Sequence, residues 1–174
     1  MGGQIAYFKK DVKRMLGKHK IRILHIWLSR SFLGIFLYRF ERSLFLLFGD
    51  LYGFIRVPFI PIQLILQSYS NIDIHYKANI KGGLLVLHSS VGCVISGQVV
   101  IGENLTLTGG NVIGVSNNNK SFIIGDNCSL GANATIIGPL VLGNFIKIGA
   151  SACVVKDCLE NGSVLVGVPA SIVN

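Results

Sequence analysis

The chain has few acidic residues, few prolines and no cysteine pairing motif. Its 174 residues contain eight Asp and Glu against sixteen Lys and Arg, together with four Pro, four Cys and one Trp. The cysteines form no CxxC pair, and no His/Cys cluster has zinc-ligand spacing. We therefore expect reduced, structural cysteines, no metal site and no fold built on disulfides.

Long apolar runs and phosphate-binding glycine motifs are also lacking. No uninterrupted apolar stretch reaches the roughly 20 residues that a membrane-spanning helix needs, and the best candidate window contains Asp50 and Arg56. There is no Walker loop, and no GxGxxG follows a predicted strand. The N-terminus shows no secretory signal, because no short apolar run ends in a small-residue cleavage site. We therefore expect a cytoplasmic protein without a nucleotide-phosphate loop.

The positive charge is confined to the first segment of the chain. Residues 1–70 hold eleven Lys and Arg against three acids, whereas residues 71–174 hold five of each. A basic segment commonly indicates a nucleic-acid partner. Here it is accompanied by eight phenylalanines and no recognition motif, so no nucleic acid is expected.

A six-residue repeat dominates the second half of the chain. Branched apolar residues recur at Ile101, Leu107, Ile113, Ile124, Leu130, Ile136, Leu142, Ile148 and Val154. Glycine directly follows six of them. A helical interpretation fails, because each glycine inside a helix costs about 1 kcal/mol. A fixed internal period of this kind indicates a repeat architecture.

The repeat predicts a coil of short strands. Six residues form one flat face and a corner, so three units close a triangular turn of eighteen residues. Stacked strands lie about 4.8 Å apart, which predicts the internal pairs Ile124–Leu142, Leu130–Ile148 and Ile136–Val154. We expect the glycines to turn the backbone, often at positive φ. Phase slips in residues 86–95 and 113–124 predict loops, the second of them polar and covering 114–122.

Together with the closing GVPASIV of residues 167–173, this repeat resembles the hexapeptide-repeat acyltransferases. The most similar branch is the serine acetyltransferase-like group, which includes O-acetyltransferases of bacterial surface polysaccharides. The resemblance covers about residues 71–174. It implies a left-handed parallel β-helix, a homotrimer and acyl transfer from coenzyme A. The handedness comes from the family, because the general rule for parallel crossovers favours the right-handed form.

The expected fold is therefore mainly β, a left-handed parallel β-helix over 71–174 with an α-helical segment over 1–70. Residues 1–22 read as an amphipathic helix, and Gly49, Gly53, Pro58 and Pro61 break any long helix after it. Two roles remain open for this segment. Its helices could lie on an anionic membrane with Lys and Arg toward lipid phosphates, at the inner face of the cell membrane. They could instead cap the coil or another trimer.

His88 is the candidate general base. Acyl transfer to a hydroxyl needs a group that removes the hydroxyl proton, and histidine has a suitable pKa near 6.5. The sequence Val86-Leu87-His88-Ser89-Ser90 matches the catalytic histidine region of the resemblance. His88 follows the inward Val86 by two places, so we expect it to project outward. The alternative is an inert surface histidine.

The chain departs from the family pattern at two positions. Leu87 stands where the family has an aspartate before the histidine, so a backbone carbonyl is expected to orient His88 instead. Ser121 stands where the resemblance places a second histidine, which helps to bind the amino-acid carboxylate. This loss argues against free serine and toward a sugar hydroxyl as acceptor. Asp73 matches an acceptor-binding aspartate, with a helix or turn cap as the alternative.

The resemblance also implies a coenzyme A groove between coils of two subunits. Lys156 would contact a phosphate of coenzyme A. Backbone groups of four small residues would contact its amides, at Gly114, Ala132, Gly149 and Ala150. Each glycine has the alternative role of a turn residue. No metal is required.

The leading hypothesis is an acetyl-CoA-dependent O-acetyltransferase that acts on a sugar hydroxyl of a surface polysaccharide or its lipid-linked precursor. Serine O-acetyltransferase is the alternative enzyme. A non-catalytic β-helix scaffold at the membrane is the alternative from another class. Expected partners are acetyl-CoA, a glycan acceptor and two further copies of the chain in a homotrimer, with a dimer of trimers as the larger assembly.

Overall fold

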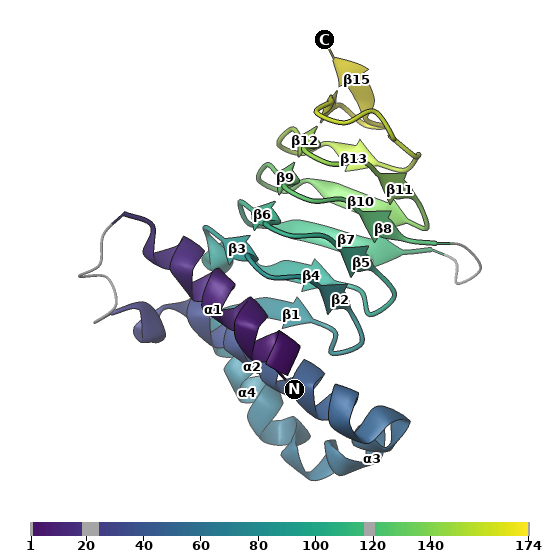
Figure 1. Ribbon diagram of the computed structural model, residues 1–174. Coiled ribbons are helices and arrows are strands. Elements are labelled where there is room, and N and C mark those ends of the chain that lie inside the picture. The colour runs from purple at the N-terminus through teal and green to yellow at the C-terminus, as the bar shows by residue number, and fades with distance from the viewer. Residues whose placement is uncertain (1, 19–24, 117–120, 174) are drawn as a thin grey trace.

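The protein consists of a helical N-terminal segment beneath a triangular prism of short strands (Figure 1). The computed structural model describes residues 2–18, 25–116 and 121–173. The helices are α1 (Gly2–Leu16), α2 (Arg30–Phe48), α3 (Tyr52–Ile55) and α4 (Ile60–Ser70), with short 3-10 turns η2 (Ile26–Leu28), η3 (Gly49–Leu51), η4 (Val57–Phe59) and η5 (Ser89–Val91). The prediction of a parallel β-helix preceded by a helical segment is confirmed.

Three sheets form the faces of the prism, and we name them A, B and C. Sheet A contains β1 (Ile72–Ile74), β4 (Cys93–Ile95), β7 (Asn111–Val115), β10 (Thr135–Gly138) and β13 (Cys153–Val154). Sheet B contains β2 (Asn79–Ile80), β5 (Val100–Ile101), β8 (Ile123–Ile124) and β11 (Val141–Leu142). Sheet C contains β3 (Leu85–Val86), β6 (Thr106–Leu107), β9 (Ser129–Leu130), β12 (Lys147–Ile148), β14 (Val164–Val166) and β15 (Ser171–Val173).

The register of these strands follows the six-residue repeat. The predicted pairs are all observed, as Ile124 with Leu142, Leu130 with Ile148 and Ile136 with Val154. Regular turns advance by eighteen residues, as from position 135 to its partner at 153. The two predicted slips appear as longer turns, from 72 to 93 and from 112 to 135. The repeated residues point inward and are buried.

The second loop is shorter than the sequence predicts. Gly114 and Val115 belong to β7, and Phe122 is buried in the core of the prism. A large aromatic side chain gains more from burial than a loop position offers, so the coil resumes earlier than the repeat indicates. Of the segment between them, residues 117–120 lie outside the described residues.

The expected backbone role of the repeat glycines is wrong. Positive φ occurs instead three places after the inward residue, at Asn104, Asn127, Asn133, Phe145 and Ser151. The glycines are needed because adjacent coils approach closely. A Cβ at Gly125 would lie 2.6 Å from the carbonyl carbon of Gly143, and one at Gly131 would lie 2.6 Å from the amide nitrogen of Ala150.

The C-terminal segment closes the open end of sheet C. Strand β14 continues the stack in parallel with β12, and β15 folds back, antiparallel to β14. An antiparallel strand covers the exposed edge that a parallel stack would otherwise leave.

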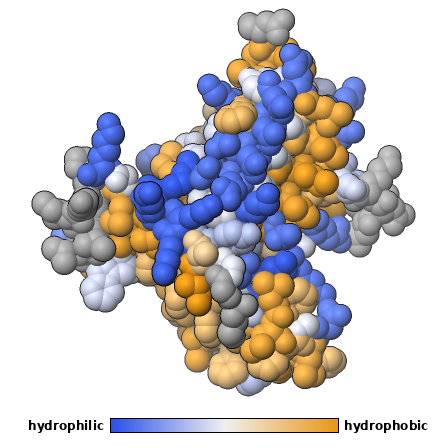
Figure 2. All heavy atoms as spheres, viewed as in Figure 1, coloured by the Kyte–Doolittle hydropathy of each residue, from blue (hydrophilic) through white to orange (hydrophobic). Residues whose placement is uncertain are grey.

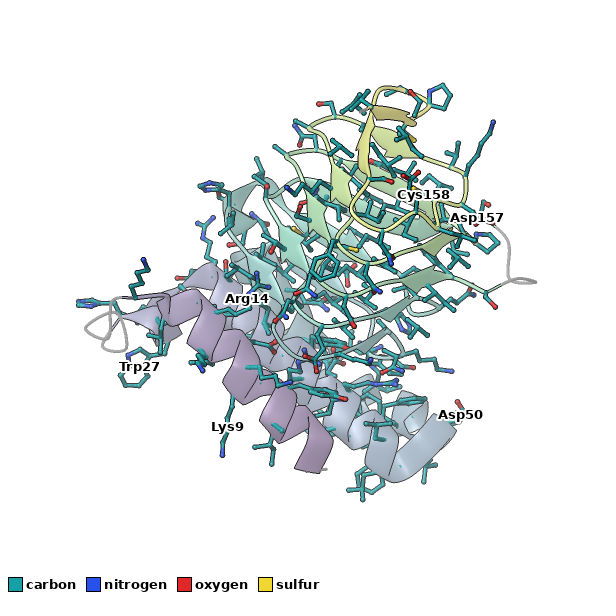
Figure 3. The ribbon with its side chains drawn as sticks, turned by 45° about the horizontal axis from the view of Figure 1, so that its top comes forward. Lys9, Arg14, Trp27, Asp50, Asp157 and Cys158 are labelled. Carbon is teal, nitrogen blue, oxygen red and sulfur yellow. The ribbon has the colours of Figure 1, made fainter. Side chains whose placement is uncertain are left out.

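The helical segment packs on the first coils of the prism, as the cap alternative predicts. Ile35 and Tyr38 of α2 join the same buried core as Ile72 and Ile74 of β1. Basic residues of α1 also contact the prism, which the lipid-facing interpretation did not expect. Arg14 donates to the carbonyl of Gly83 and, over 2.8 Å, to Oγ1 of Thr106. In Figure 3, Arg14 lies toward the strands, whereas Lys9 points away from them.

Candidate functional site

His88 lies at the corner where the chain passes from sheet C to sheet A. Strand β3 ends at Val86, and η5 begins directly after His88. The His88 backbone N–H donates to the carbonyl of Thr108 over 2.9 Å, and its own carbonyl accepts from Val91 over 3.3 Å. The side chain is exposed, as the spacing from Val86 predicts. The backbone is therefore fixed at this corner while the imidazole faces outward.

The imidazole of His88 has no hydrogen-bond partner within residues 2–18, 25–116 and 121–173. The backbone carbonyl that we expected to orient the ring is therefore not seen there. Leu87 is 51% exposed on the same turn and offers no acceptor.

Asp73 lies in β1, beside the turn that carries His88. It is exposed and stands opposite Val94 in the register of sheet A. The side-chain amide of Asn71 donates to the carbonyl of Ser90 over 3.2 Å, which joins the start of β1 to η5. A hollow of about 290 Å³ opens here, and Asp73 lines it together with Gln67, Ser68, Asn71, Gly92 and Val94. Asp73 therefore sits within a strand and not at the end of a helix.

A glycine pair that the sequence analysis did not single out supports the His88 turn. Gly109 has φ +139°, and a Cβ at this position would collide with the carbonyl oxygen of His88. Its N–H donates to Oδ1 of the buried Asn111 over 2.9 Å, while the Asn111 amide donates to the carbonyl of Gly131 over 2.7 Å. The Gly-Gly-Asn sequence was the available signal.

Three predicted coenzyme A residues lie along the same corner as His88. Ala132 follows β9, while Gly149 and Ala150 follow β12, each at the passage from sheet C to sheet A. The backbone N–H of Ser151 donates to the carbonyl of Ala132 over 2.8 Å, which stacks the two turns. Gly149 packs beneath β14, because a Cβ there would lie 2.9 Å from Cγ1 of Val166. Ala150 is exposed, whereas Ala132 and Gly149 are half-buried.

The other two predicted coenzyme A residues lie away from that corner. Gly114 belongs to β7, and a Cβ there would meet Cδ1 of Ile137 at an ordinary 3.7 Å. Lys156 is exposed and follows β13 at the passage from sheet A to sheet B. One protomer therefore presents these residues at two different edges of sheet A, and they do not form a single cluster.

Cys93 is unsuited to act as a nucleophile beside this turn. Its side chain is buried at the start of β4, and burial raises the pKa of its thiol above the ordinary value. The thiolate is the reactive form of cysteine. The buried thiol of Cys93 is therefore a poor nucleophile.

Comparison with known proteins gives consistent results. No protein-family model matches the chain. A serine acetyltransferase of Mycobacterium tuberculosis is 32% identical over 107 residues, which cover 60% of this chain and 46% of that protein. The chain spans about half the length of the first curated relatives that it matches.

Solved structures match over nearly the whole chain. The serine acetyltransferase of Neisseria gonorrhoeae gives a TM-score of 0.80 at 27% identity, covering 98% of this chain and 66% of that one. A Brucella abortus serine acetyltransferase, solved in complex with coenzyme A, gives 0.77 at 24% identity, covering 99% and 68%. In sequence and in fold, this chain resembles the serine acetyltransferase-like branch of the hexapeptide-repeat acetyltransferases.

Proposed function

We propose that this chain transfers an acetyl group from acetyl-CoA to a hydroxyl, with His88 as the general base. The observation that carries the proposal is the position of His88. Its side chain is exposed at a corner whose next turns present small residues at Ala132 and Ala150. Such an edge admits an extended thioester close to the imidazole. The named relatives and structural neighbours support the same chemistry.

The transfer proceeds by direct attack. The imidazole of His88 takes the proton from the acceptor hydroxyl as its oxygen attacks the thioester carbonyl carbon. The tetrahedral intermediate then collapses, the C–S bond breaks and the imidazolium returns the proton to the departing thiolate of coenzyme A. Main-chain N–H groups near the carbonyl would stabilise its developing negative charge.

Serine is the first candidate acceptor, because the relatives and structural neighbours are named for it. This reverses the order of preference that the sequence alone favours. A sugar hydroxyl of a surface polysaccharide is the second candidate. It is favoured by Leu87 before the base and by Ser121, exposed at the edge of the second loop, where the resemblance places a carboxylate-binding histidine.

A homotrimer would complete the coenzyme A site. Exposed apolar side chains lie on the outer faces of sheets A and B, at Val94, Val100, Val112 and Ile123, and Figure 2 shows apolar surface along the prism. A second protomer would cover part of it. The His88 corner of one protomer could then face the Lys156 edge of another, which would unite the two separated sets of residues.

A donor and acceptor assay tests the proposal. The purified chain is incubated with acetyl-CoA and either L-serine or a panel of sugars, and free coenzyme A thiol is measured. Serine-dependent thiol release supports the first acceptor, and sugar-dependent release supports the second. If no acceptor raises thiol release above the protein-free rate, the scaffold alternative replaces the enzyme.

A further inference from the structure

Three charged residues of α2, Arg39, Glu41 and Arg42, are buried, whereas Arg30 at the start of the helix is exposed. Arg39 is 3% exposed and donates to the carbonyls of Ile80 and Lys81. Arg42 donates to the carbonyls of Tyr76 and Lys77. These are backbone groups of the first coil. The side of α2 that meets the prism therefore holds these buried charges together with the apolar Ile35 and Tyr38.

Glu41 and Arg56 form an ion pair between the helical segments. Glu41 of α2 accepts from the hydroxyl of Tyr52 over 3.0 Å and lies 3.3 Å from Nη2 of Arg56. Arg56 also donates to Oε1 of Gln63 over 3.1 Å. Between positions 43 and 70, Asp50 is the charged residue that is exposed. It pairs with Lys77 of the first coil over 3.1 Å.

The outer side of the same helices is apolar. Large exposed side chains on it include Phe36, Phe40, Leu46, Leu47, Phe48, Leu51, Phe54, Phe59, Ile62, Leu64 and Ile65. Phe54 of α3 is 78% exposed and Ile65 of α4 is 69% exposed. Figure 2 shows mostly apolar surface over the lower end of the molecule. A water-exposed helix usually has a polar outer side, and that polar outer side is missing here.

The apolar surface surrounds a projecting tip. Leu46, Leu47 and Phe48 are consecutive and all exposed, and successive helix residues point about 100° apart. The end of α2 is therefore apolar on several sides at once. In Figure 1 this end, α3 and the start of α4 lie at the part of the molecule farthest from β15. We name the tip as residues 44–66.

The two helical segments that carry the tip are rich in apolar residues, and a hollow lies between them. No single helix of the described chain is long and apolar enough to cross a bilayer, but the segments 30–55 and 57–70 pass that test as a pair bent by 75°. A hollow of about 240 Å³ opens between them, and apolar side chains of Leu37, Phe40, Leu44, Phe59, Ile62 and Leu66 line most of it. A lipid acyl chain fits the chemistry of this hollow.

We propose that the tip inserts into the hydrocarbon of one bilayer leaflet and leaves the prism in water. A flat protein partner would cover one side of the tip, whereas lipid surrounds a projection on every side. The exposed Lys9 and Lys13 of α1 could contact anionic headgroups. They add to the binding, whereas the apolar tip supplies most of it.

Vesicle flotation tests this proposal with the full chain. Phe54→Asp and Ile65→Asp each place a charge in the tip, and we expect each to reduce the partition coefficient into phosphatidylcholine–phosphatidylglycerol vesicles by at least about tenfold. Leu159→Asp is the matched control, because Leu159 is also 69% exposed but lies on the loop after β13. Circular dichroism and urea unfolding establish that each variant is folded.

Two further measurements separate lipid insertion from the alternatives. A Trp27→Phe/Phe54→Trp protein carries its one tryptophan in the tip, and we expect brominated acyl chains to quench its fluorescence. High salt should leave bound protein on the vesicles. Loss of binding in salt, absence of quenching, or tip variants that float like the parent while their oligomeric mass falls would overturn the proposal. The last result would assign the tip to a second copy of the chain.

Discussion

Arg39 and Asp11 form a buried two-point ion pair that joins α2 to α1. Nε of Arg39 lies 2.9 Å from Oδ2 of Asp11, and Nη2 lies 3.3 Å from Oδ1. The same carboxylate accepts from the backbone N–H groups of Gly83 and Leu84 over 2.7 Å each. One carboxylate and one guanidinium therefore link both helices to the first coil.

Removal of Asp11 should loosen this link. In Asp11→Ala the Arg39 charge stays buried without its partner, and we expect unfolding to become easier by about 3–5 kcal/mol. Asp11→Asn retains an acceptor for Gly83 and Leu84, so the free energy of unfolding should fall less in this variant. Urea unfolding followed by circular dichroism measures both. Equal stability of Asp11→Ala and the parent would show that the pair is not a structural link.

A side chain at Gly109 should disturb the base without unfolding the prism. The Cβ in Gly109→Ala would press against the His88 carbonyl, so the turn that holds the imidazole must shift. Displacement of a catalytic group by about 1 Å can cost about a hundredfold in rate. We expect kcat/KM to fall by at least about tenfold, while the far-ultraviolet spectrum is retained. Full activity would mean that the position of this turn does not matter.

Gly114→Ala tests the predicted coenzyme A contact in β7. The added methyl group finds ordinary van der Waals distances within the protomer, so stability should stay within about 0.5 kcal/mol of the parent. If the donor passes over Gly114, the KM for acetyl-CoA should rise. An unchanged KM would leave Gly114 as a structural glycine and move the donor toward Ala132 and Ala150.

His75 should make stability depend on pH. Its pKa is lowered from the ordinary value, mainly by burial and then by the positive charge of Arg56. The unfolded chain therefore binds a proton at higher pH than the folded chain does, so stability falls as pH drops below about 6.5. Asn at position 75 keeps an acceptor for the Lys77 N–H, which now donates to Nδ1 of His75 over 3.1 Å. We expect the free energy of unfolding of His75→Asn to vary less with pH in this window; identical slopes would contradict the assignment.

The prism was predictable from the sequence because each inward position is set by packing alone. A branched side chain every sixth residue must stack on its equivalent one turn later, which gave Leu130 opposite Ile148. The outward position of His88 followed from the same count. The role of the glycines did not follow, since the close approach of Gly131 to the next coil depends on three-dimensional spacing.

The docking of the helices could not be predicted in the same way. Asp11 and Arg39 are distant in sequence, and a charged residue among apolar ones reads equally well as lipid-facing or buried. The site was only partly predictable for a related reason. Ala132 and Ala150 share the His88 corner, but Lys156 lies on another edge. The six-residue repeat of one chain does not indicate how such edges would meet in an assembly of several copies.

The central claim is that the His88 imidazole accepts the proton of the acceptor hydroxyl. The most direct measurement is kcat/KM for thiol release by His88→Ala, with acetyl-CoA and the acceptor that the parent uses. We predict a fall of about 10²–10⁴-fold, with the KM for acetyl-CoA and the unfolding midpoint little changed. Parent-like turnover by folded His88→Ala would contradict the claim and remove His88 from the mechanism.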